Sequence, residues 1–316
     1  MSDPSTLALA QAKSPIRRGG NKAGGDALGK RQTYMWAALF VGPNVLLFAI
    51  FIIIPILGAF ALSLFQWNLI RPPVFVGLDN FTRMINDPRA INSIVRTAYL
   101  VVGGVIPTIL ISFALAVLIN TKFPGLKLIR TLYLMPIVIS FVASAVLWGY
   151  LLDPRWGPVN WVLAQFGIPG PQWLESTTWA LPAVTIVTIW LRIPVALVLY
   201  LAALQNINQS LIEAGQLDGA NFFQRMRFII WPSVRPVTLL VTIVTLRGVL
   251  FESFDVVAVM TEGGPLRSTD ILINYIYQAA FDRLDFGYAS ALAVVLFVIV
   301  MILTLFVTGK PKGEAR

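Results

Sequence analysis

Four stretches of this sequence contain more than 20 residues without a charged side chain. They hold 39, 25, 22 and 24 uncharged residues, and they lie at residues 32–70, 97–121, 131–152 and 286–309. A helix needs about 20 apolar residues to cross the hydrocarbon core of a bilayer, since each residue adds about 1.5 Å. The sequence therefore predicts a protein that folds in lipid and crosses the bilayer several times.

Two further apolar stretches each contain one arginine. Arg192 lies within residues 178–204, and Arg247 lies within residues 237–259. With the uncharged stretches they predict an all-α fold that has six transmembrane helices within a membrane domain of residues 32–309. The predicted spans are approximately 34–63, 97–120, 131–152, 178–204, 237–259 and 286–309.

The composition excludes most enzyme chemistry. Only 12% of the residues are charged, about half of what a soluble domain carries, and the chain has no cysteine and no histidine. Disulfides, Cys/His metal sites and Ser-His-Asp nucleophiles are therefore ruled out, and no metal site is expected. Gly24 to Lys30 has the spacing of a phosphate loop, but Arg31 stands where Ser or Thr should bind magnesium. Any energy source must come from a partner or an ion gradient.

The distribution of charge predicts the orientation in the membrane. The two termini and the second and fourth connecting segments sum to 15 basic and 5 acidic residues. The other three segments, counted with the carboxylates at the outer end of the fifth span, sum to 7 basic and 10 acidic residues. Because Lys and Arg are retained on the cytoplasmic side, both termini are expected there. The net charge of +9 thus reflects topology and does not indicate nucleic-acid binding.

The two ends of the chain are expected to be cytoplasmic tails. Residues 1–31 are basic and rich in Gly, Ser, Lys and Arg, a composition that is typical of a disordered segment. Anionic lipid head groups would attract such a tail. Residues 310–316 form a shorter basic tail after the last span.

The cytoplasmic segment of residues 205–236 has the pattern of two short helices joined by a tight turn. Ser210 and Glu213 have the spacing of a capping box, in which both side chains satisfy free amides at a helix start. Gly219 is expected to end that helix, and Asp218 or Asn221 to cap the next one. An exposed helical hairpin that is rich in apolar residues favours a docking surface for another protein. A structured loop without a partner is the alternative.

Residues of this segment resemble the EAA loop of binding-protein-dependent ABC importer permeases. The matching residues are Glu213-Ala214-Gly215 and Asp218-Gly219-Ala220, followed by Ile229 and Pro232 at the expected spacing. Two positions depart from the family pattern, because Gly215 replaces the usual second alanine and Trp231 replaces a common leucine. In that family the loop forms a coupling helix that seats in a cleft of the cytoplasmic ATPase subunit. The resemblance implies that coupling residues are Glu213, Ala214, Gly215, Asp218, Gly219 and Ala220. The alternative for Glu213 and Asp218 is that they only cap helices.

Other motifs extend the resemblance over nearly the whole chain from about Met35. They resemble the sugar-type branch, and the last two favour the maltose-permease or glycerol-phosphate-permease A type. The motifs are Phe75-Val76-Gly77-Leu78-Asp79-Asn80-Phe81, Leu132-Tyr133-Leu134-Met135-Pro136 with Trp148, Gly157-Pro158-Val159-Asn160, Thr261-Glu262-Gly263-Gly264-Pro265 and Gly287-Tyr288-Ala289-Ser290-Ala291.

The resemblance implies a multi-pass permease subunit of a bacterial or archaeal plasma membrane, and not an enzyme. The implied solute is a carbohydrate or a glycerophosphate-like compound. The implied partners are a dimer of cytoplasmic ATPase subunits, a second related permease and an extracytoplasmic solute-binding protein, together with membrane lipid. No cofactor is expected in this chain, because ATP and Mg would bind to the ATPase subunits.

The two intramembrane arginines are candidates for the solute pathway. Each lies about 11 to 12 residues from the cytoplasmic end of its span, roughly 17 Å deep. A charge at that depth costs at least about 2.5 to 3.5 kcal/mol unless it faces water, a carboxylate or carbonyls. Glu252 and Asp255 are the nearest carboxylates, and Trp190 could stack on a sugar ring. A polar cavity that binds solute and a structural ion pair between helices both remain open.

Two other classes of function are weighed against the permease. An ion-coupled secondary transporter of a small polar solute should contain an internal repeat and titrating carboxylates within its spans, and no such repeat is evident. A membrane-embedded enzyme is disfavoured by the lack of His, Cys and paired carboxylates within a span.

Overall fold

The computed structural model describes residues 25–120 and 133–309, and the packing divides the chain into two units at Gly58. A single helical rod runs from α1 (Gly25–Phe48) through η2 (Ala49–Ile53) into α2 (Ile54–Leu62), and its residues up to Gly58 belong to the first unit. No side chain of residues 32–58 is buried, although most of them are apolar. An apolar helix without a protein partner is suited to lipid, as the prediction of a first span requires.

The second unit consists of helices with one short ladder. The ladder pairs β1 (Phe65–Gln66) with β2 (Val74–Phe75) in antiparallel register, a small departure from the predicted all-α fold. The long helices of this unit are α4 (Pro88–Ile119), α8 (Ala180–Gln205), α11 (Trp231–Phe251) and α14 (Phe286–Thr308). The shorter elements are α3 (Asp79–Ile85), α6 (Phe141–Leu151), α7 (Pro158–Gln165), α9 (Gln209–Leu217), α10 (Phe222–Arg225), η3 (Met226–Ile230), α12 (Ser253–Met260), α13 (Leu272–Tyr277) and η4 (Gln278–Asp282).

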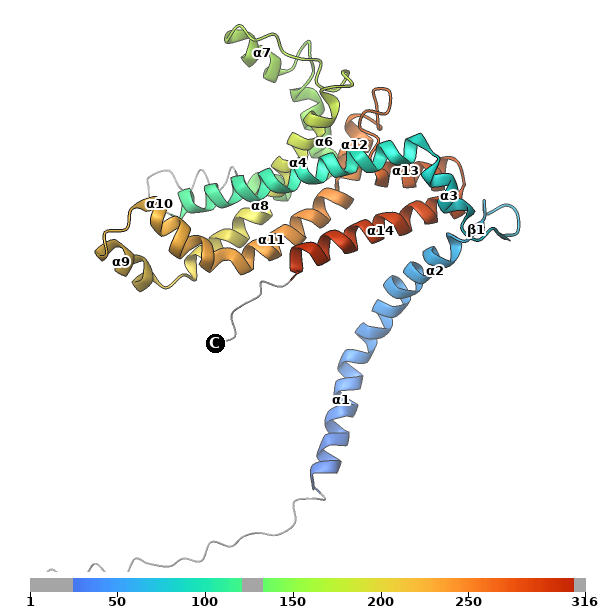
Figure 1. Ribbon diagram of the computed structural model, residues 1–316, viewed down its shortest axis with the longest axis horizontal. Helices are drawn as coiled ribbons and strands as arrows, with labels where there is room; N and C mark the ends of the chain where they lie inside the picture. Colours follow the sequence, from blue (N-terminus) through green and yellow to red (C-terminus); the bar gives the residue numbers. More distant parts are fainter. Residues whose placement is uncertain (1–24, 121–132, 310–316) are drawn as a thin grey trace, which may run out of the picture. The chain divides into compact units, whose positions relative to one another are not determined.

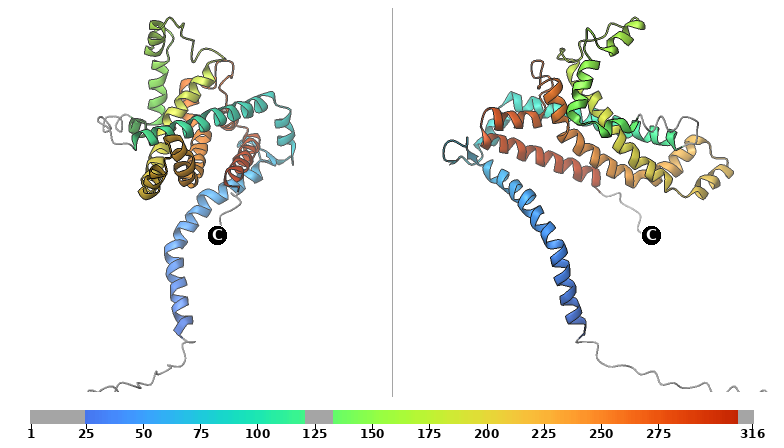
Figure 2. Two further views of the ribbon diagram at one scale, coloured as in Figure 1. Left: turned by 60° about the vertical axis from the view of Figure 1, so that its left-hand side comes forward. Right: turned by 180° about the vertical axis from the view of Figure 1, so that it is seen from behind.

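Helices α4, α8 and α11 pack against one another and form the centre of this unit, as Figures 1 and 2 show. Small side chains allow the close approach, because a helix pair in lipid gains stability mainly from tight packing. The buried small residues of α4 are Ala90, Ser93, Thr97, Gly104, Thr108, Ser112 and Ala116. Helices α9 and α10 lie at one end of the packed helices, and β1, α3 and α13 lie at the other (Figure 1).

Five helices in the described ranges are long and apolar enough to cross a membrane. They are Gln32–Leu62, Pro88–Ile119, Ala180–Gln205, Phe222–Met260 and Phe286–Thr308. They cover five of the six predicted spans. The helix at the fifth predicted span, Phe222–Met260, is much longer than the predicted residues 237–259, because α10 and η3 continue into α11 and α12.

The third predicted span, residues 131–152, differs from a simple rod. Its first two residues lie outside the described ranges, and residues 133–138 are helical. The helix then breaks at Ser140, whose side chain accepts a hydrogen bond from the Ala143 amide and starts α6 afresh. Serine favours such a cap because its oxygen satisfies a free amide. Six spans and cytoplasmic termini therefore stay predictions.

Candidate functional site

The predicted cytoplasmic hairpin is present as α9 and α10. The capping box predicted at Ser210 and Glu213 is wrong: α9 begins at Asn208, whose Oδ1 accepts from the Ser210 amide at 3.0 Å. The capping box is at the second helix instead. There the Asn221 side chain accepts from the Gln224 amide at 2.9 Å, and the Gln224 side chain accepts from the Asn221 amide at 2.7 Å. Two asparagines, and not Glu213 or Asp218, thus cap these helix starts.

Gly219 forms the turn between the two helices, as predicted. Its φ of +77° lies in the left-handed region, which glycine adopts at low cost. Its amide donates to the Gln216 carbonyl at 3.0 Å, and the next amide, of Ala220, donates to the Gly215 carbonyl at 2.9 Å. These two bonds define a Schellman motif that satisfies the last carbonyls of α9. Arg225 closes the turn with a hydrogen bond to the Ala220 carbonyl at 2.6 Å.

Gly215 lies at a close contact between α9 and η3. It is buried, and a Cβ added to it would lie 2.7 Å from Cδ1 of Ile229. The glycine that departs from the family pattern therefore lets α9 approach η3 more closely than an alanine would. Because Ile229 can move its terminal methyl, this contact is adjustable.

Large apolar side chains of the hairpin face away from the protein. Leu217 is 89% exposed and Phe223 is 79% exposed, and Glu213 and Asp218 are exposed beside them. The other large exposed apolar side chains are Leu211 and Phe222 of the hairpin and Phe228 of the adjoining η3. An exposed apolar patch with acidic neighbours is typical of a protein-binding surface, because a lone soluble surface rarely leaves such a patch uncovered.

The intramembrane charges meet at one carboxylate. Glu252, at the end of α11, pairs through Oε2 with Nη2 of Arg192 from α8, and its Oε1 accepts from Nη1 of Arg247 at 3.1 Å. The Arg192 side chain is 11% exposed, whereas the Arg247 side chain is 72% exposed. We call these three residues the arginine triad. An ion pair between helices is therefore present beside a cavity, and solute binding there stays a prediction.

A cavity of about 250 Å³ lies beside the arginine triad. All three triad residues line it, and the other lining residues are Phe141, Val195, Ala196, Leu199, Val241, Val244 and Thr245. Two predicted pathway residues are placed elsewhere. Trp190 packs edge-on against Trp148 with ring centroids 5.6 Å apart, and Asp255 does not line this cavity.

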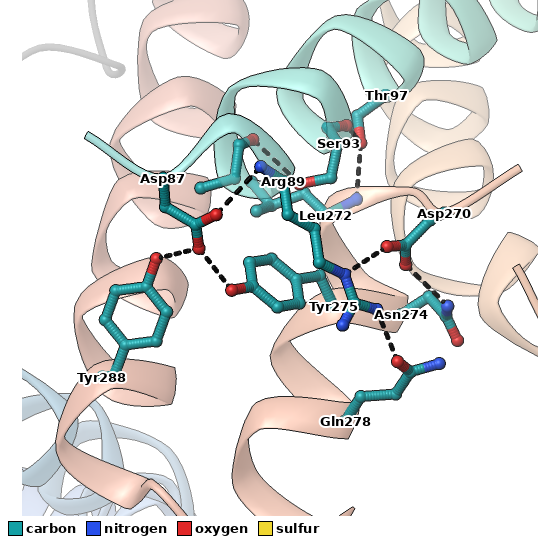
Figure 3. A network of polar contacts seen from close by, with 11 residues as sticks. Asp87, Arg89, Ser93, Thr97, Asp270, Leu272, Asn274, Tyr275, Gln278 and Tyr288 are labelled. Atoms are coloured by element: carbon teal, nitrogen blue, oxygen red, sulfur yellow. Dashed lines mark hydrogen bonds and ion pairs between the residues drawn. The ribbon is translucent and has the colours of Figure 1, made fainter. Parts of the chain in front are cut away.

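A second cluster of polar side chains, which the sequence did not predict, lies where α4, α13 and α14 meet (Figure 3). Arg89 donates from Nε to Asp270 at 2.6 Å and from Nη2 to Gln278 at 2.5 Å, and it lies 4.2 Å from the centre of the Tyr275 ring. Asn274 donates to the other oxygen of Asp270 at 2.9 Å. We call this cluster, with Asp87 and Tyr288, the outer network.

Asp87 begins α4 and binds two tyrosines of the outer network. One of its oxygens accepts from the Arg89 amide, and the other accepts from the hydroxyls of Tyr275 and Tyr288. Burial opposes the charge on Asp87, but the hydrogen bonds from Tyr275, Tyr288 and the backbone outweigh it and lower the pKa of this carboxyl. In the sequence, the Asp87-Pro88 pair is the one local indication of this cluster, because aspartate followed by proline is typical of a helix start.

No group of three or more His, Cys, Asp and Glu side chains within residues 25–120 and 133–309 could hold a metal ion.

Known proteins resemble this chain along most of its length. A family model described as binding-protein-dependent transport system inner membrane component matches residues 33–309. The probable starch degradation products transport system permease protein AmyD of Thermoanaerobacterium thermosulfurigenes is 29% identical over 89% of this chain and 96% of that protein. The sn-glycerol-3-phosphate transport system permease protein UgpA of Escherichia coli O6:K15:H31 is 32% identical over 88% of this chain and 94% of that protein.

A solved structure shares the fold. It is a chain of a bacterial ABC transporter involved in the import of the acidic polysaccharide alginate, with a TM-score of 0.76 and 25% sequence identity. The match covers 89% of this chain and 95% of that chain.

Proposed function

The chain belongs to the family of binding-protein-dependent transport system inner membrane components and is a permease subunit of an ABC importer, and from this premise we propose how it works. It is a multi-pass membrane protein and a transport subunit, not an enzyme. We propose that it crosses a bacterial or archaeal inner membrane six times with both termini in the cytoplasm. The excess of Lys and Arg in alternate segments supports this orientation.

The hairpin of α9 and α10 is the proposed coupling element. Its exposed apolar side chains, with Glu213 and Asp218 at their edge, would seat in a cleft of a cytoplasmic ATPase subunit. The Schellman turn at Gly219 fixes the connection between α9 and α10, and Gly215 packs α9 closely against η3. Closure of an ATPase dimer, in which ATP and Mg²⁺ bind, would therefore move α11 and the helices packed against it.

The continuous helix from Phe222 to Met260 supports this mechanism. It joins the coupling hairpin directly to the arginine triad, because Arg247 and Glu252 lie on the same rod as α10. A displacement of the hairpin would reach the membrane interior without an intervening loop. A second, related permease subunit and an extracytoplasmic solute-binding protein complete the proposed importer.

The proposed solute is a carbohydrate or a related small polar compound. The names of the relatives support this class, since they mention starch degradation products and sn-glycerol-3-phosphate. The cavity beside the arginine triad is the proposed part of the pathway, with Arg192, Arg247 and Glu252 as polar lining. Trp190 and Asp255 are further proposed pathway residues, although neither lines this cavity.

Co-purification with an ATPase subunit tests the function. The chain, expressed with its genomic neighbours, should retain such a subunit through detergent purification. Gly219→Pro should abolish this retention and solute uptake while leaving membrane insertion intact, because proline fixes φ near −65° and has no amide to donate.

Gly167→Pro is the matched control for that variant. Gly167 follows α7 with a φ of +71°, and its amide donates to the Ala164 carbonyl at 3.0 Å, as Gly219 donates to Gln216. The control should retain the ATPase subunit, since this turn lies outside the coupling hairpin. Equal retention in wild type and Gly219→Pro would reject the coupling role.

A further inference from the structure

The arginine triad carries more positive than negative charge. Two guanidinium groups, those of Arg192 and Arg247, share the single carboxylate of Glu252. Glu252 can neutralise only one of the two guanidinium groups, and Arg247 is the partner that is open to solvent. The excess of one positive charge is therefore suited to a second, external anion.

Arg192 is held in place by its neighbours but does not use all of its hydrogen-bond donors. Its guanidinium lies 4.8 Å from the centre of the Phe141 ring and against Gly248, where a Cβ would come within 2.5 Å of Nη1. Its Nε is buried and has no hydrogen-bond partner among the described residues. A guanidinium can donate five hydrogen bonds in a fixed fork, which matches carboxylate and phosphate geometry.

The cavity gives an anion access to both arginines. Its volume of about 250 Å³ is just below the roughly 300 Å³ at which small-molecule pockets begin, so it suits one charged group of a solute. Most of its wall is apolar, which strengthens the attraction between the arginines and an anion. Phe141, in the first turn of α6, also lines the cavity, and the positive end of that helix dipole adds to the field.

We propose that this cavity binds a carboxylate or phosphate group of the transported solute, and that Glu252 takes the place of that group when solute is absent. This inference rests on the proposed function, since it names the solute class of the same pathway. Arg247, the more exposed partner, exchanges Glu252 for the solute anion while Arg192 stays fixed. A neutral solute cannot make this exchange, so Glu252 acts as a specificity-determining residue against uncharged sugars.

Equilibrium dialysis against the purified importer complex in lipid nanodiscs tests the proposal. Two pairs of labelled probes separate the chemistry: glucuronate against glucose for a carboxylate, and glycerol 3-phosphate against glycerol for a phosphate. We expect at least one anionic probe to bind about tenfold more tightly than its neutral counterpart at equal ionic strength. Equal binding within both pairs, or no binding of either anion, would overturn the proposal.

Two substitutions distinguish an anion site from a structural ion pair. Glu252→Gln removes the competing charge and should tighten anion binding about tenfold, whereas Arg247→Gln should weaken it by a similar factor. Arg247 is mostly exposed, so that variant is expected to fold. The matched controls Glu175→Gln and Arg155→Gln, on exposed segments elsewhere, should leave binding unchanged.

If Glu252→Gln weakens anion binding as Arg247→Gln does, Glu252 is a structural partner and the proposal is wrong. The ATPase subunit should co-purify with every variant. Retention of that subunit together with a failed binding result would overturn only the anion site, whereas its loss in wild type would overturn the proposed function itself.

Discussion

The outer network and the arginine triad both contain charged side chains of low exposure, but only in the outer network does the arginine have a carboxylate to itself, while the second carboxylate, Asp87, accepts from two tyrosine hydroxyls. Arg89 donates to Asp270 and Gln278 at 2.6 and 2.5 Å and lies on the Tyr275 ring. Its side chain is 9% exposed, and that of Asp270 is fully buried. In the triad two arginines compete for one carboxylate, and one of them, Arg247, is 72% exposed.

The difference indicates two roles for charge in a membrane protein. A saturated network has one best geometry and rigidifies the region that it joins, here the ends of α4, α13 and α14. An unsaturated cluster has donors left over, and its pairing can be exchanged for a ligand. The first is expected to matter for stability, and the second for solute selection.

Arg89→Ala should have the largest effect on stability. It leaves Asp270 buried without its ion pair, and such a loss typically costs about 3–5 kcal/mol. Denaturant unfolding of the purified protein in detergent measures it, with Arg155→Ala as an exposed control. A cost below about 1 kcal/mol would remove the distinction between the two clusters.

Gly248→Ala tests how firmly Arg192 is held. The added methyl would come within 2.5 Å of Nη1 and 2.9 Å of Cδ of Arg192, so the arginine side chain must shift. Overpacking of this kind costs about 1–3 kcal/mol, and anion selectivity should fall with it. Gly149→Ala is the matched control in α6, because nothing lies within 4 Å of the methyl that it adds. Denaturant unfolding measures the cost. If neither variant changes the denaturation midpoint, Gly248 does not confine Arg192.

The acid stability of the outer network should depend on Asp87. Its pKa is lowered from 3.8, because hydrogen bonds from Tyr275 and Tyr288 outweigh the opposing effect of burial. The ionised form therefore stabilises the folded state above about pH 4, and this contribution is lost as the pH falls through the lowered pKa. Thermal unfolding of wild type and Asp87→Asn should differ most near neutral pH and converge in acid. A constant difference over this range would contradict the assignment.

Arg247→Gln should have the smallest effect on stability. Its side chain is mostly exposed, and exposed ion pairs contribute about 0–1 kcal/mol. The same denaturation experiment as for Arg89→Ala measures it. A loss as large as that of Arg89→Ala would show that the triad is as structural as the outer network, and the comparison would fail.

Local patterns predicted the hairpin better than its caps. Gly219 ends α9 with a positive φ, as its residue type indicated. Ser210 failed as the first cap because Asn208, two residues earlier, is an equally strong cap and already accepts the Ser210 amide. A helix start is therefore predictable to within a few residues, and several nearby polar side chains compete for the role.

The grouping of pathway residues was predictable only in part. The low charge of the spans made Arg192, Arg247 and Glu252 conspicuous, and they do lie together. Asp255 lies only three residues beyond Glu252, yet it does not line the cavity. Glu252 is the residue between α11 and α12, and depth within a span does not specify the direction in which a side chain points around its helix.

The sequence by itself determined that the chain folds in a membrane, the positions of most helices and the turn between α9 and α10, because apolar length and glycine conformation act over a few neighbouring residues. Only the tertiary structure decided which charges meet. Arg89 pairs with a carboxylate 181 residues away, and Asp87 binds hydroxyls 188 and 201 residues away. No local pattern encodes such contacts, since they arise from the packing of small-faced helices, and that packing leaves one cluster saturated and the other with a positive charge to spare.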